Sequence, residues 1–238
     1  VAGLAAFVAV KLIYFIVRKL DEKYVETGFR HGQTITACLV ALSHGTNDAQ
    51  KTMGIITLTL IAVGLQPSGS GPQLWVIAVC GLAIALGTYM GGWRVIRTLG
   101  KGLTEIATPQ GFAAEASSAT TILVSSHLGF ALSTTQVCSG SIIGSGLGKK
   151  GGTIDWKVAA RMLIAWLVTF PAAGVIGAAA CAVAKINVWG TLAVAAIAVV
   201  AALIIFRLSR RNPVNAMNVN EGSEVKVNAK AATAAAAA

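Results

Sequence analysis

The chain of 238 residues is 55% hydrophobic and only 12% charged, whereas charged residues make up about a quarter of a typical soluble domain. This composition argues against a soluble protein and indicates an integral membrane protein. The formal net charge is +10, but the basic residues gather in short segments between apolar stretches, which is the pattern of cytoplasmic loops. The charge therefore indicates orientation in a membrane, and we expect no nucleic-acid partner.

The apolar stretches predict an all-α membrane domain over residues 1–206. A helix of about 20 apolar residues crosses a bilayer. The expected spans, in chain order, are residues 1–17, 34–64, 73–90, 162–184 and 188–206. The first span begins with Val1 and is interrupted by Lys11, so we expect the chain to be a piece of a longer protein. Residues 207–238 are polar and then alanine-rich, which predicts a disordered cytoplasmic tail.

The basic clusters predict what lies between the third and fourth of these spans. Clusters on both sides of residues 103–148 are expected inside the cell, so this stretch must cross the membrane an even number of times. Its apolar runs are short and interrupted by polar residues, and full spans would expose many polar groups to lipid. We therefore expect a re-entrant helical hairpin over residues 106–148. Gly140 and Gly144, in its second arm, are spaced for close helix packing.

The second expected span contains a polar interruption, SHGTNDAQKTMG, at residues 43–54. Gly45 and Asn47 favour helices poorly, and an Asn side chain can compete for backbone hydrogen bonds. We therefore expect a helix that is broken at mid-membrane, with freed carbonyls that could hold a cation and a new helix N-terminus that could face an anion. Asp48 and Lys51 are three residues apart and could pair. A pair that only neutralises itself is the alternative to a functional site.

Several motifs resemble those of the inorganic phosphate transporter (Pit) family. They are SHGTNDAQKTMGI, GTYMGGWRVIRTLG and GFAAEASSATTILVSSHLGFALSTTQVCSGSIIGSG, and together they cover most of residues 33–148. The resemblance implies the carboxy-terminal half of a bacterial member. It also implies a fold in which two inverted repeats each contain a broken helix and a re-entrant helical hairpin. The amino-terminal half, with a first G-x-N-D copy, would then be a partner outside this chain.

The resemblance also implies which residues bind substrate and ions. Substrate or ion contacts are expected from the G-x-N-D segment, from the S-T-T turn of the hairpin and from the carboxylate in GFAAEASSA: Asn47, Asp48, Gln50, Lys51, Glu115, Ser133, Thr134, Thr135 and Gln136. His44 and His127 are candidates for a proton relay, although a structural role for His127 is an equal alternative. Arg94 and Arg97 could attract phosphate at the cytoplasmic mouth or simply anchor the topology. No pair of histidines has metal-ligand spacing, so no protein metal site and no cofactor are expected.

The function implied is secondary active transport of inorganic phosphate across the cell inner membrane by a multi-pass protein. Sodium-coupled members resemble N-D-V-A-N where this chain has NDAQK, and a fixed ammonium at Lys51 could replace a bound sodium ion. The hypothesis is therefore proton symport, with phosphate or a complex of phosphate with a divalent metal as cargo. A buried carboxyl group away from cations holds a proton better than one beside a lysine, so Glu115 is the better proton carrier than Asp48.

Other interpretations stay open at this point. Sodium-coupled phosphate symport and transport of another oxyanion such as sulfate are the transport alternatives. A membrane enzyme is not expected, because G-x-S-x-G, H-E-x-x-H and P-loop motifs are absent. A purely structural subunit would not need the ionisable groups of the NDAQK segment. The lipid bilayer is an expected partner, and a homo-oligomer is compatible with the sequence.

Overall fold

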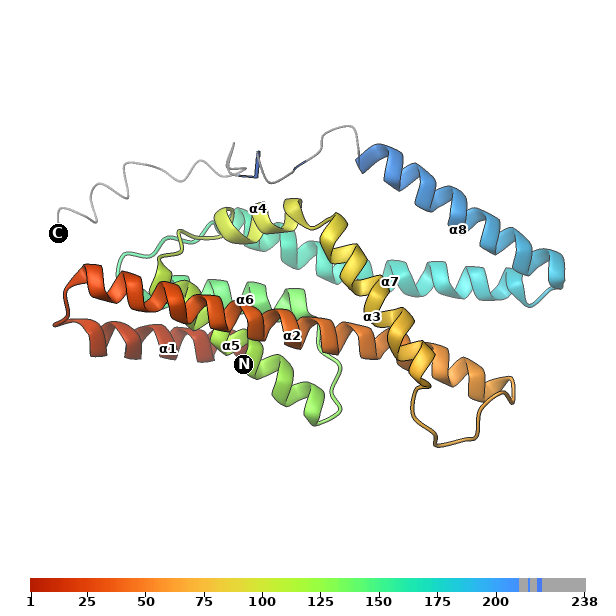
Figure 1. The fold of residues 1–238 in the computed structure, drawn as a ribbon. Coiled ribbons are helices and arrows are strands. Elements are labelled where there is room, and N and C mark those ends of the chain that lie inside the picture. Colours follow the sequence, from red (N-terminus) through yellow and green to blue (C-terminus); the bar gives the residue numbers. More distant parts are fainter. Residues whose placement is uncertain (210–213, 215–217, 220–238) are drawn as a thin grey trace. The chain divides into compact units, whose positions relative to one another are not determined.

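The computed structural model describes residues 1–209, 214, 218 and 219, apart from the side chains of Met90, Arg94, Lys101 and Ser209 (Figure 1). The helices in this part of the chain are α1 (Ala2–Val17), α2 (Glu22–Ala62), α3 (Leu74–Met90), α4 (Trp93–Lys101), α5 (Thr108–His127), α6 (Thr134–Gly148), α7 (Trp156–Ala184) and α8 (Val188–Ser209). No strand joins them within the described residues, apart from an isolated bridge between Thr104 and Ile154. The all-α prediction is confirmed.

The chain divides into two compact units at residue 155. The first contains α1 to α6 and the second contains α7 and α8. The sequence predicts one membrane domain over residues 1–206, and this stays a prediction. α8 continues to Ser209, three residues into the expected tail. Most of that tail, at residues 210–213, 215–217 and 220–238, lies outside the described residues.

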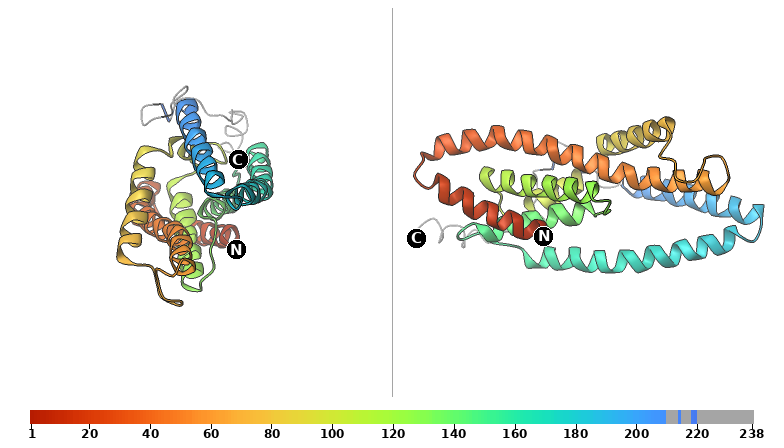
Figure 2. Two further views of the ribbon diagram at one scale, coloured as in Figure 1. Left: turned by 90° about the vertical axis from the view of Figure 1, so that its right-hand side faces the viewer. Right: turned by 90° about the horizontal axis from the view of Figure 1, so that it is seen from below.

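In the first unit, α5 and α6 form a helical hairpin that packs between α1 and α2. Both arms contact α1, and α5 also lies along α2, as the right-hand view of Figure 2 shows. The buried positions of the hairpin are mostly small, as in the run Ser117, Ser118 and Ala119 of α5. Small residues allow helix backbones to approach closely where no water drives association. The expected re-entrant segment is thus a helical hairpin, and its re-entry into a membrane stays a prediction.

The backbones of α1 and α6 approach each other closely. A Cβ atom added at Gly144 would clash with the carbonyl oxygen of Gly3, and one added at Gly3 would lie 2.7 Å from the carbonyl oxygen of Gly140. The predicted close packing at Gly140 and Gly144 is confirmed, and its partner is the first turn of α1. The hairpin is therefore held against α1 by glycine contacts and against α2 by polar contacts, which are described below.

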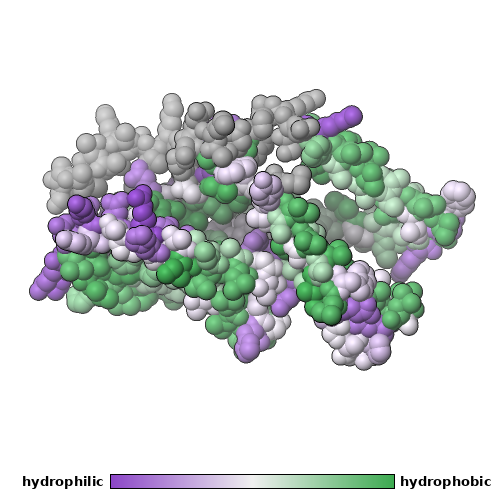
Figure 3. Space-filling model, viewed as in Figure 1, coloured by the Kyte–Doolittle hydropathy of each residue, from purple (hydrophilic) through white to green (hydrophobic). Residues whose placement is uncertain are grey.

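Large apolar side chains face outward in both units. Phe15 and Ile16 of α1 and Leu82 of α3 each expose more than half of their surface, and Figure 3 shows the hydrophobic colour along the outer faces of α1 and α3. Two helices are long and apolar enough to cross a membrane by length and composition, Trp156–Ala184 and Val188–Leu208, among the residues described. In the second unit these helices form an antiparallel pair, in which Asn187 caps the start of α8 by accepting from the Gly190 N–H at 2.9 Å.

The prediction of a broken helix is wrong. α2 is a single helix of 41 residues that continues through the whole SHGTNDAQKTMG segment. Ser43 and Thr46 donate their hydroxyl hydrogens back to carbonyls within the same helix, those of Val40 and Leu42, and so leave the backbone ladder intact. The Asn47 amide does not compete for its own backbone, because it bonds to the hairpin instead.

One further element, α4, is not predicted by the sequence. It follows Gly92, whose φ of 93° is in the left-handed region, a conformation that glycine adopts without strain. The GGWRVIRTLG segment therefore turns sharply at Gly92 and continues as a helix of nine residues.

Candidate functional site

The polar segment of α2 lines one face of the helix. His44, Asn47, Asp48 and Lys51 occupy positions i, i+3, i+4 and i+7, which places them on the same side of an α-helix. This face is directed at the tip of the hairpin, where α5 ends and α6 begins, as the hydrogen bonds to Leu132 and Thr134 show. We call these four residues together with Leu132 and Thr134 the Asp48 cluster.

The Asp48 carboxylate is the centre of this cluster. Its Oδ1 accepts from the Lys51 ammonium at 2.9 Å and from the Asn47 amide at 3.1 Å. Its Oδ2 accepts from the Thr134 hydroxyl at 3.3 Å and lies 3.3 Å from His44 Nδ1. His44 Nδ1 is also 2.9 Å from the Thr134 hydroxyl oxygen. The pairing of Asp48 with Lys51 predicted from their spacing is confirmed.

The carbonyl of Leu132 joins the hairpin tip to α2. It accepts from the Lys51 ammonium at 2.6 Å and from the Asn47 amide at 2.9 Å. Ser126, at the end of α5, donates to the side-chain oxygen of Asn47 (Oδ1) at 3.3 Å. Asn47 is 4% exposed and Thr134 is 5% exposed, whereas the Asp48 and Lys51 side chains are 29% and 39% exposed. The cluster thus has a buried part at Asn47 and Thr134 and an open, ionic edge at Asp48 and Lys51.

The start of α6 adds hydroxyl groups and backbone N–H groups beside this edge. Ser133 is the N-cap of α6, and its hydroxyl accepts from the Gln136 backbone N–H at 3.4 Å. Ser133, Thr135 and Gln136 are exposed, whereas Thr134 is buried in the cluster. The first-turn N–H groups of a helix have no acceptors inside the helix, and together with the helix dipole they favour anions.

Glu115 lies in a separate polar contact between α5 and α2. Its carboxylate accepts from the Thr36 hydroxyl at 2.7 Å and from the Gln33 amide at 3.5 Å. Thr36 precedes Asp48 by 12 residues on one helix, which corresponds to about 18 Å at 1.5 Å per residue. The structure therefore separates Glu115 from the Asp48 cluster along α2.

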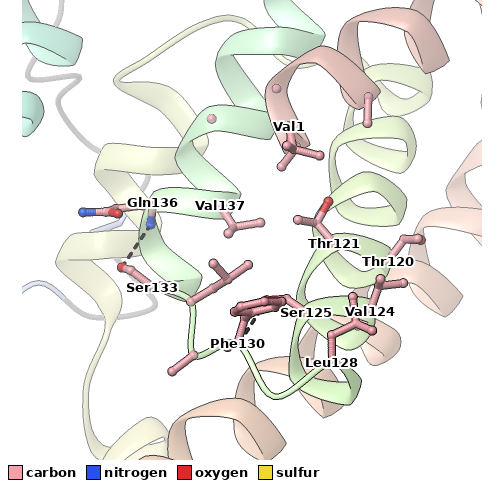
Figure 4. Close-up of a pocket in the computed structure, with 16 residues that line it drawn as sticks. Val1, Thr120, Thr121, Val124, Ser125, Leu128, Phe130, Ser133, Gln136 and Val137 are labelled. Atoms are coloured by element: carbon pink, nitrogen blue, oxygen red, sulfur yellow. Dashed lines mark hydrogen bonds between the residues drawn. The ribbon is translucent and has the colours of Figure 1, made fainter.

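An apolar cavity of about 860 Å³ lies on the other side of the hairpin tip. It is bounded by the first turn of α1, by α5 and by the start of α6, and Phe130 and Val137 are among the side chains around it in Figure 4. Leu132 and Ser133 line this cavity, whereas Asn47, Asp48 and Lys51 do not. The tip of the hairpin thus separates an apolar cavity from the polar cluster, and the polar cluster has the chemistry that an anion or a cation requires.

Comparison with known proteins identifies the family of this chain. The profile of the phosphate transporter family matches residues 2–177, which include every residue of the Asp48 cluster and both arms of the hairpin. The chain belongs to the phosphate transporter family. This confirms the resemblance on which the expected site residues rest.

Several relatives within the phosphate transporter family are similar over most of this chain. A protein of Mycobacterium leprae, named as a probable low-affinity inorganic phosphate transporter, is 52% identical over 91% of the chain. A protein of Bacillus subtilis with the same name is 39% identical over 74% of the chain. The chain spans about half of each relative, 53% and 54% of their lengths. A solved structure titled as a sodium-dependent phosphate transporter matches 66% of the chain with a TM-score of 0.56 and 31% identity, over 42% of that protein.

Membership of this family has two immediate consequences. The family and its named relatives are transporters, which confirms the expectation that the chain is not an enzyme. A phosphate transporter family protein is also a membrane protein, in agreement with the composition.

The structure brings only some of the predicted site residues together. The residues that meet are His44, Asn47, Asp48, Lys51 and Thr134, with Ser133, Thr135 and Gln136 at the start of α6 beside them. Gln50 is exposed on another face of α2, and His127 is exposed at the end of α5. Arg97 lies on α4, and the side chain of Arg94 is outside the described part of the chain. The roles of all these residues stay predictions.

Sequence reasoning missed the partners that complete the two polar contacts. They are the Leu132 carbonyl and Ser126 for the Asp48 cluster, and Gln33 and Thr36 for Glu115. A signal existed for Thr36, because Thr36, Ser43 and Asn47 are polar at spacings of seven and four residues along an apolar helix, and all three are buried. Such a stripe indicates a helix face that packs against other polar groups. A backbone carbonyl such as that of Leu132 carries no sequence signal.

Proposed function

We propose that the chain is the carboxy-terminal half of a multi-pass secondary transporter that carries inorganic phosphate across the bacterial inner membrane. The observation that supports this most is the Asp48 cluster, an ionic group that joins α2 to the hairpin tip in a phosphate transporter family protein. The chain spans about half the length of its relatives. The complete transport path therefore requires the other half of the parent protein, which is a partner in this proposal.

Phosphate binding is assigned to the start of α6 and the open edge of the cluster. The exposed hydroxyls of Ser133 and Thr135 and the first-turn N–H groups of α6 supply donors for phosphate oxygens. An anion at this position would be repelled by the Asp48 carboxylate, but Lys51 neutralises that charge at 2.9 Å. The Lys51 ammonium is half-exposed and can turn toward a bound phosphate. A charge-assisted hydrogen bond to phosphate would then offset the repulsion between phosphate and the Asp48 carboxylate.

The same arrangement favours phosphate over sulfate. An ionised Asp48 can only accept hydrogen bonds, and phosphate at neutral pH still carries a proton that it can donate to such an acceptor, whereas sulfate carries none. A bound sulfate would therefore face Asp48 without a hydrogen bond. We expect sulfate to compete weakly for the site.

Coupling is assigned to protons. The Lys51 ammonium lies between the Asp48 Oδ1 atom and the Leu132 carbonyl, at 2.9 and 2.6 Å, and oxygen atoms of these kinds are also ligands for hard cations. A permanent side-chain cation in this position removes the need for sodium there. Glu115 is the proton carrier in this proposal, because its hydrogen-bond partners Thr36 and Gln33 are neutral and so leave the carboxylate charge unbalanced.

Sodium coupling is the second candidate, and one specific observation favours it. The solved structure that resembles this chain is titled as a sodium-dependent transporter and is 31% identical. Against it stands Lys51, whose ammonium holds the position between two oxygen ligands. The form of the cargo, free phosphate or a complex with a divalent metal, is a separate question that the same assay answers.

Uptake of radiolabelled phosphate into proteoliposomes that contain the full-length parent protein tests the proposal. One arm applies an inward proton gradient without sodium, and another applies a sodium gradient at constant pH. Further arms add magnesium or an excess of unlabelled sulfate, and protein-free liposomes are the control. The proposal predicts uptake in the proton arm that a protonophore abolishes and that sulfate barely inhibits. Uptake in the sodium arm alone would establish the second candidate, and a requirement for magnesium would identify the metal complex as cargo.

A further inference from the structure

A second cavity of about 840 Å³ lies at the carboxy-terminal end of α1, beside the chain that follows α6. We call it the α1–α6 groove. The charged residues that line it are all basic: Lys11, Arg18, Lys149 and Lys150. It shares no residue with the Asp48 cluster or with the apolar cavity of Figure 4. The groove is therefore a separate feature of the first unit.

The sequence explains why the groove forms. Val8, Leu12 and Phe15 recur at spacings of four and three residues, which gives α1 a continuous apolar face along the groove. The end of α6 reaches α1 because Gly148 has no side chain. A Cβ atom there would lie 2.9 Å from Cβ of Val10. Lys149 and Lys150 leave α6 immediately after this contact, and so their side chains enter the groove beside α1.

The cations of the groove have no anionic partner in the part of the chain that the structure describes. Among the described residues, no carboxylate pairs with Lys11, Arg18, Lys149 or Lys150. Two of them lie over aromatic rings instead, with Lys11 Nζ 4.6 Å from the centre of the Phe7 ring and Arg18 Cζ 4.6 Å from that of Phe15. A cation–π contact holds the charged group against the helix without neutralising it. The groove thus combines unneutralised positive charge with an apolar wall.

We propose that the α1–α6 groove binds an anionic phospholipid, with the phosphate of the headgroup near Arg18, Lys149 and Lys150 and an acyl chain along Val8, Leu12 and Phe15. Free phosphate would use the cations but not the apolar wall, and an uncharged lipid would use the wall alone. Basic loops lie on the cytoplasmic side of membrane proteins, and basic pockets on that side of the membrane bind anionic headgroups. An anionic phospholipid is therefore the ligand class that matches both the positive charge and the apolar face of the groove.

Native mass spectrometry of the detergent-purified full-length parent protein tests this proposal. The probes are phosphatidylglycerol and phosphatidylcholine with identical acyl chains. The test variant combines Arg18→Gln, Lys149→Gln and Lys150→Gln. The control combines Lys19→Gln, Lys23→Gln and Arg30→Gln, which removes the same charge from exposed residues that do not line the groove. One cation near an anionic lipid surface changes affinity roughly fivefold, so the test variant should bind phosphatidylglycerol about a hundredfold more weakly. The control should retain wild-type binding.

Three results would overturn the proposal. Equal binding of the two lipids by the wild type would show that charge is irrelevant to the groove, and unchanged phosphatidylglycerol binding by the test variant would place the lipid elsewhere. Displacement of phosphatidylglycerol by millimolar inorganic phosphate or glycerol phosphate would identify a site for free anions. If the triple variant does not fold, Lys149→Gln with Lys150→Gln changes only residues outside the helices, and it should weaken phosphatidylglycerol binding about 25-fold.

Discussion

Asp48 and Lys51 form more than a local ion pair. A pair that only neutralised itself would engage no other segment, but here Lys51 also donates to the Leu132 carbonyl and Asp48 accepts from Thr134. These contacts join residues 81 and 86 positions apart in the chain. The pair therefore links α2 to the hairpin tip, and any change in its charge state changes the contact between the two.

Asn47 is expected to contribute to stability through its buried amide. Replacing it with Ala removes the bonds to the Leu132 carbonyl and to Ser126 and should destabilise the folded protein by about 1–3 kcal/mol, the cost of leaving buried polar groups without partners. Gln50→Ala, at an exposed position of the same helix, is the control and should change stability by less than about 0.5 kcal/mol. Thermal unfolding of the full-length parent in detergent measures both. Equal effects would show that the Asn47 contacts are not stabilising.

Lys51 is expected to determine the coupling ion. Lys51→Asn removes the ammonium but leaves the Asp48 carboxylate and the Leu132 carbonyl as oxygen ligands. We expect phosphate uptake by this variant to become dependent on sodium, because a cation is again required beside Asp48. Lys23→Asn, in the exposed first turn of α2, should leave uptake independent of sodium. If the Lys51 variant transports normally without sodium, the ammonium does not act as a built-in cation.

Glu115 is expected to carry the proton. Glu115→Gln keeps an acceptor for the Thr36 hydroxyl but cannot gain or lose a proton. Uptake driven by a proton gradient should be lost, whereas exchange of labelled for unlabelled phosphate at constant pH should persist. Glu105→Gln, at an exposed loop position, is the matched control and should behave as the wild type. Loss of exchange as well as of driven uptake would point to a structural role for Glu115.

At the residue scale, the sequence predicts contacts between side chains that are close together along one helix. The Asp48–Lys51 pair follows from a separation of three residues on a helix, and the structure confirms it. The bond between Thr36 and Glu115 spans 79 residues, and it depends on how α5 packs against α2. No local pattern specifies such a contact, so the partners of Glu115 became visible only in the fold.

At the element scale, the unbroken α2 changes which segment we expect to supply the ion-binding groups. The sequence suggests that a break in α2 would free carbonyls for a cation and create a helix N-terminus for an anion. In the structure a carbonyl and a helix N-terminus lie at the hairpin tip instead, at Leu132 and at the start of α6, and ion binding by them stays a proposal. The prediction failed because it treated the low helix propensities of Gly45 and Asn47 as decisive. The Thr46 and Asn47 side chains have hydrogen-bond partners that leave the helix intact.

The packing of α1 against α6 should depend on Gly144 more than on Gly140. A Cβ atom at Gly144 would clash with the Gly3 carbonyl, whereas one at Gly140 would have as its nearest neighbour the Gly3 nitrogen at 4.0 Å. Gly144→Ala should therefore destabilise the protein by about 1–3 kcal/mol through overpacking. Gly140→Ala should be neutral or stabilise it by up to about 1 kcal/mol, since Ala favours helix. Thermal unfolding of the two variants provides the comparison, and equal midpoints would contradict the close contact.

At the scale of the whole molecule, composition and motifs predict the class of protein well. The hydrophobic content indicates an all-helical membrane protein, and motifs within residues 33–148 indicate the family, which the match over residues 2–177 confirms. The division at residue 155 was not predictable, because a boundary between units of packed helices need not coincide with a change in composition. Arg18 and Lys149, which belong to separate basic clusters in the sequence, line one groove; the placement of both clusters on the cytoplasmic side stays a prediction.

The central claim is that the Asp48 cluster belongs to the phosphate path of the complete transporter. Proton-driven uptake of labelled phosphate by the full-length parent, compared between wild type, Asp48→Asn and Asp21→Asn, tests it most directly. Asp21 caps α2 by accepting from the Lys23 N–H, and Asn caps helices equally well, so this control should transport normally. Asp48→Asn should lower uptake about 10- to 100-fold, as expected for the loss of a charged hydrogen-bonding group. Wild-type uptake by Asp48→Asn would contradict the claim and leave the cluster a structural link.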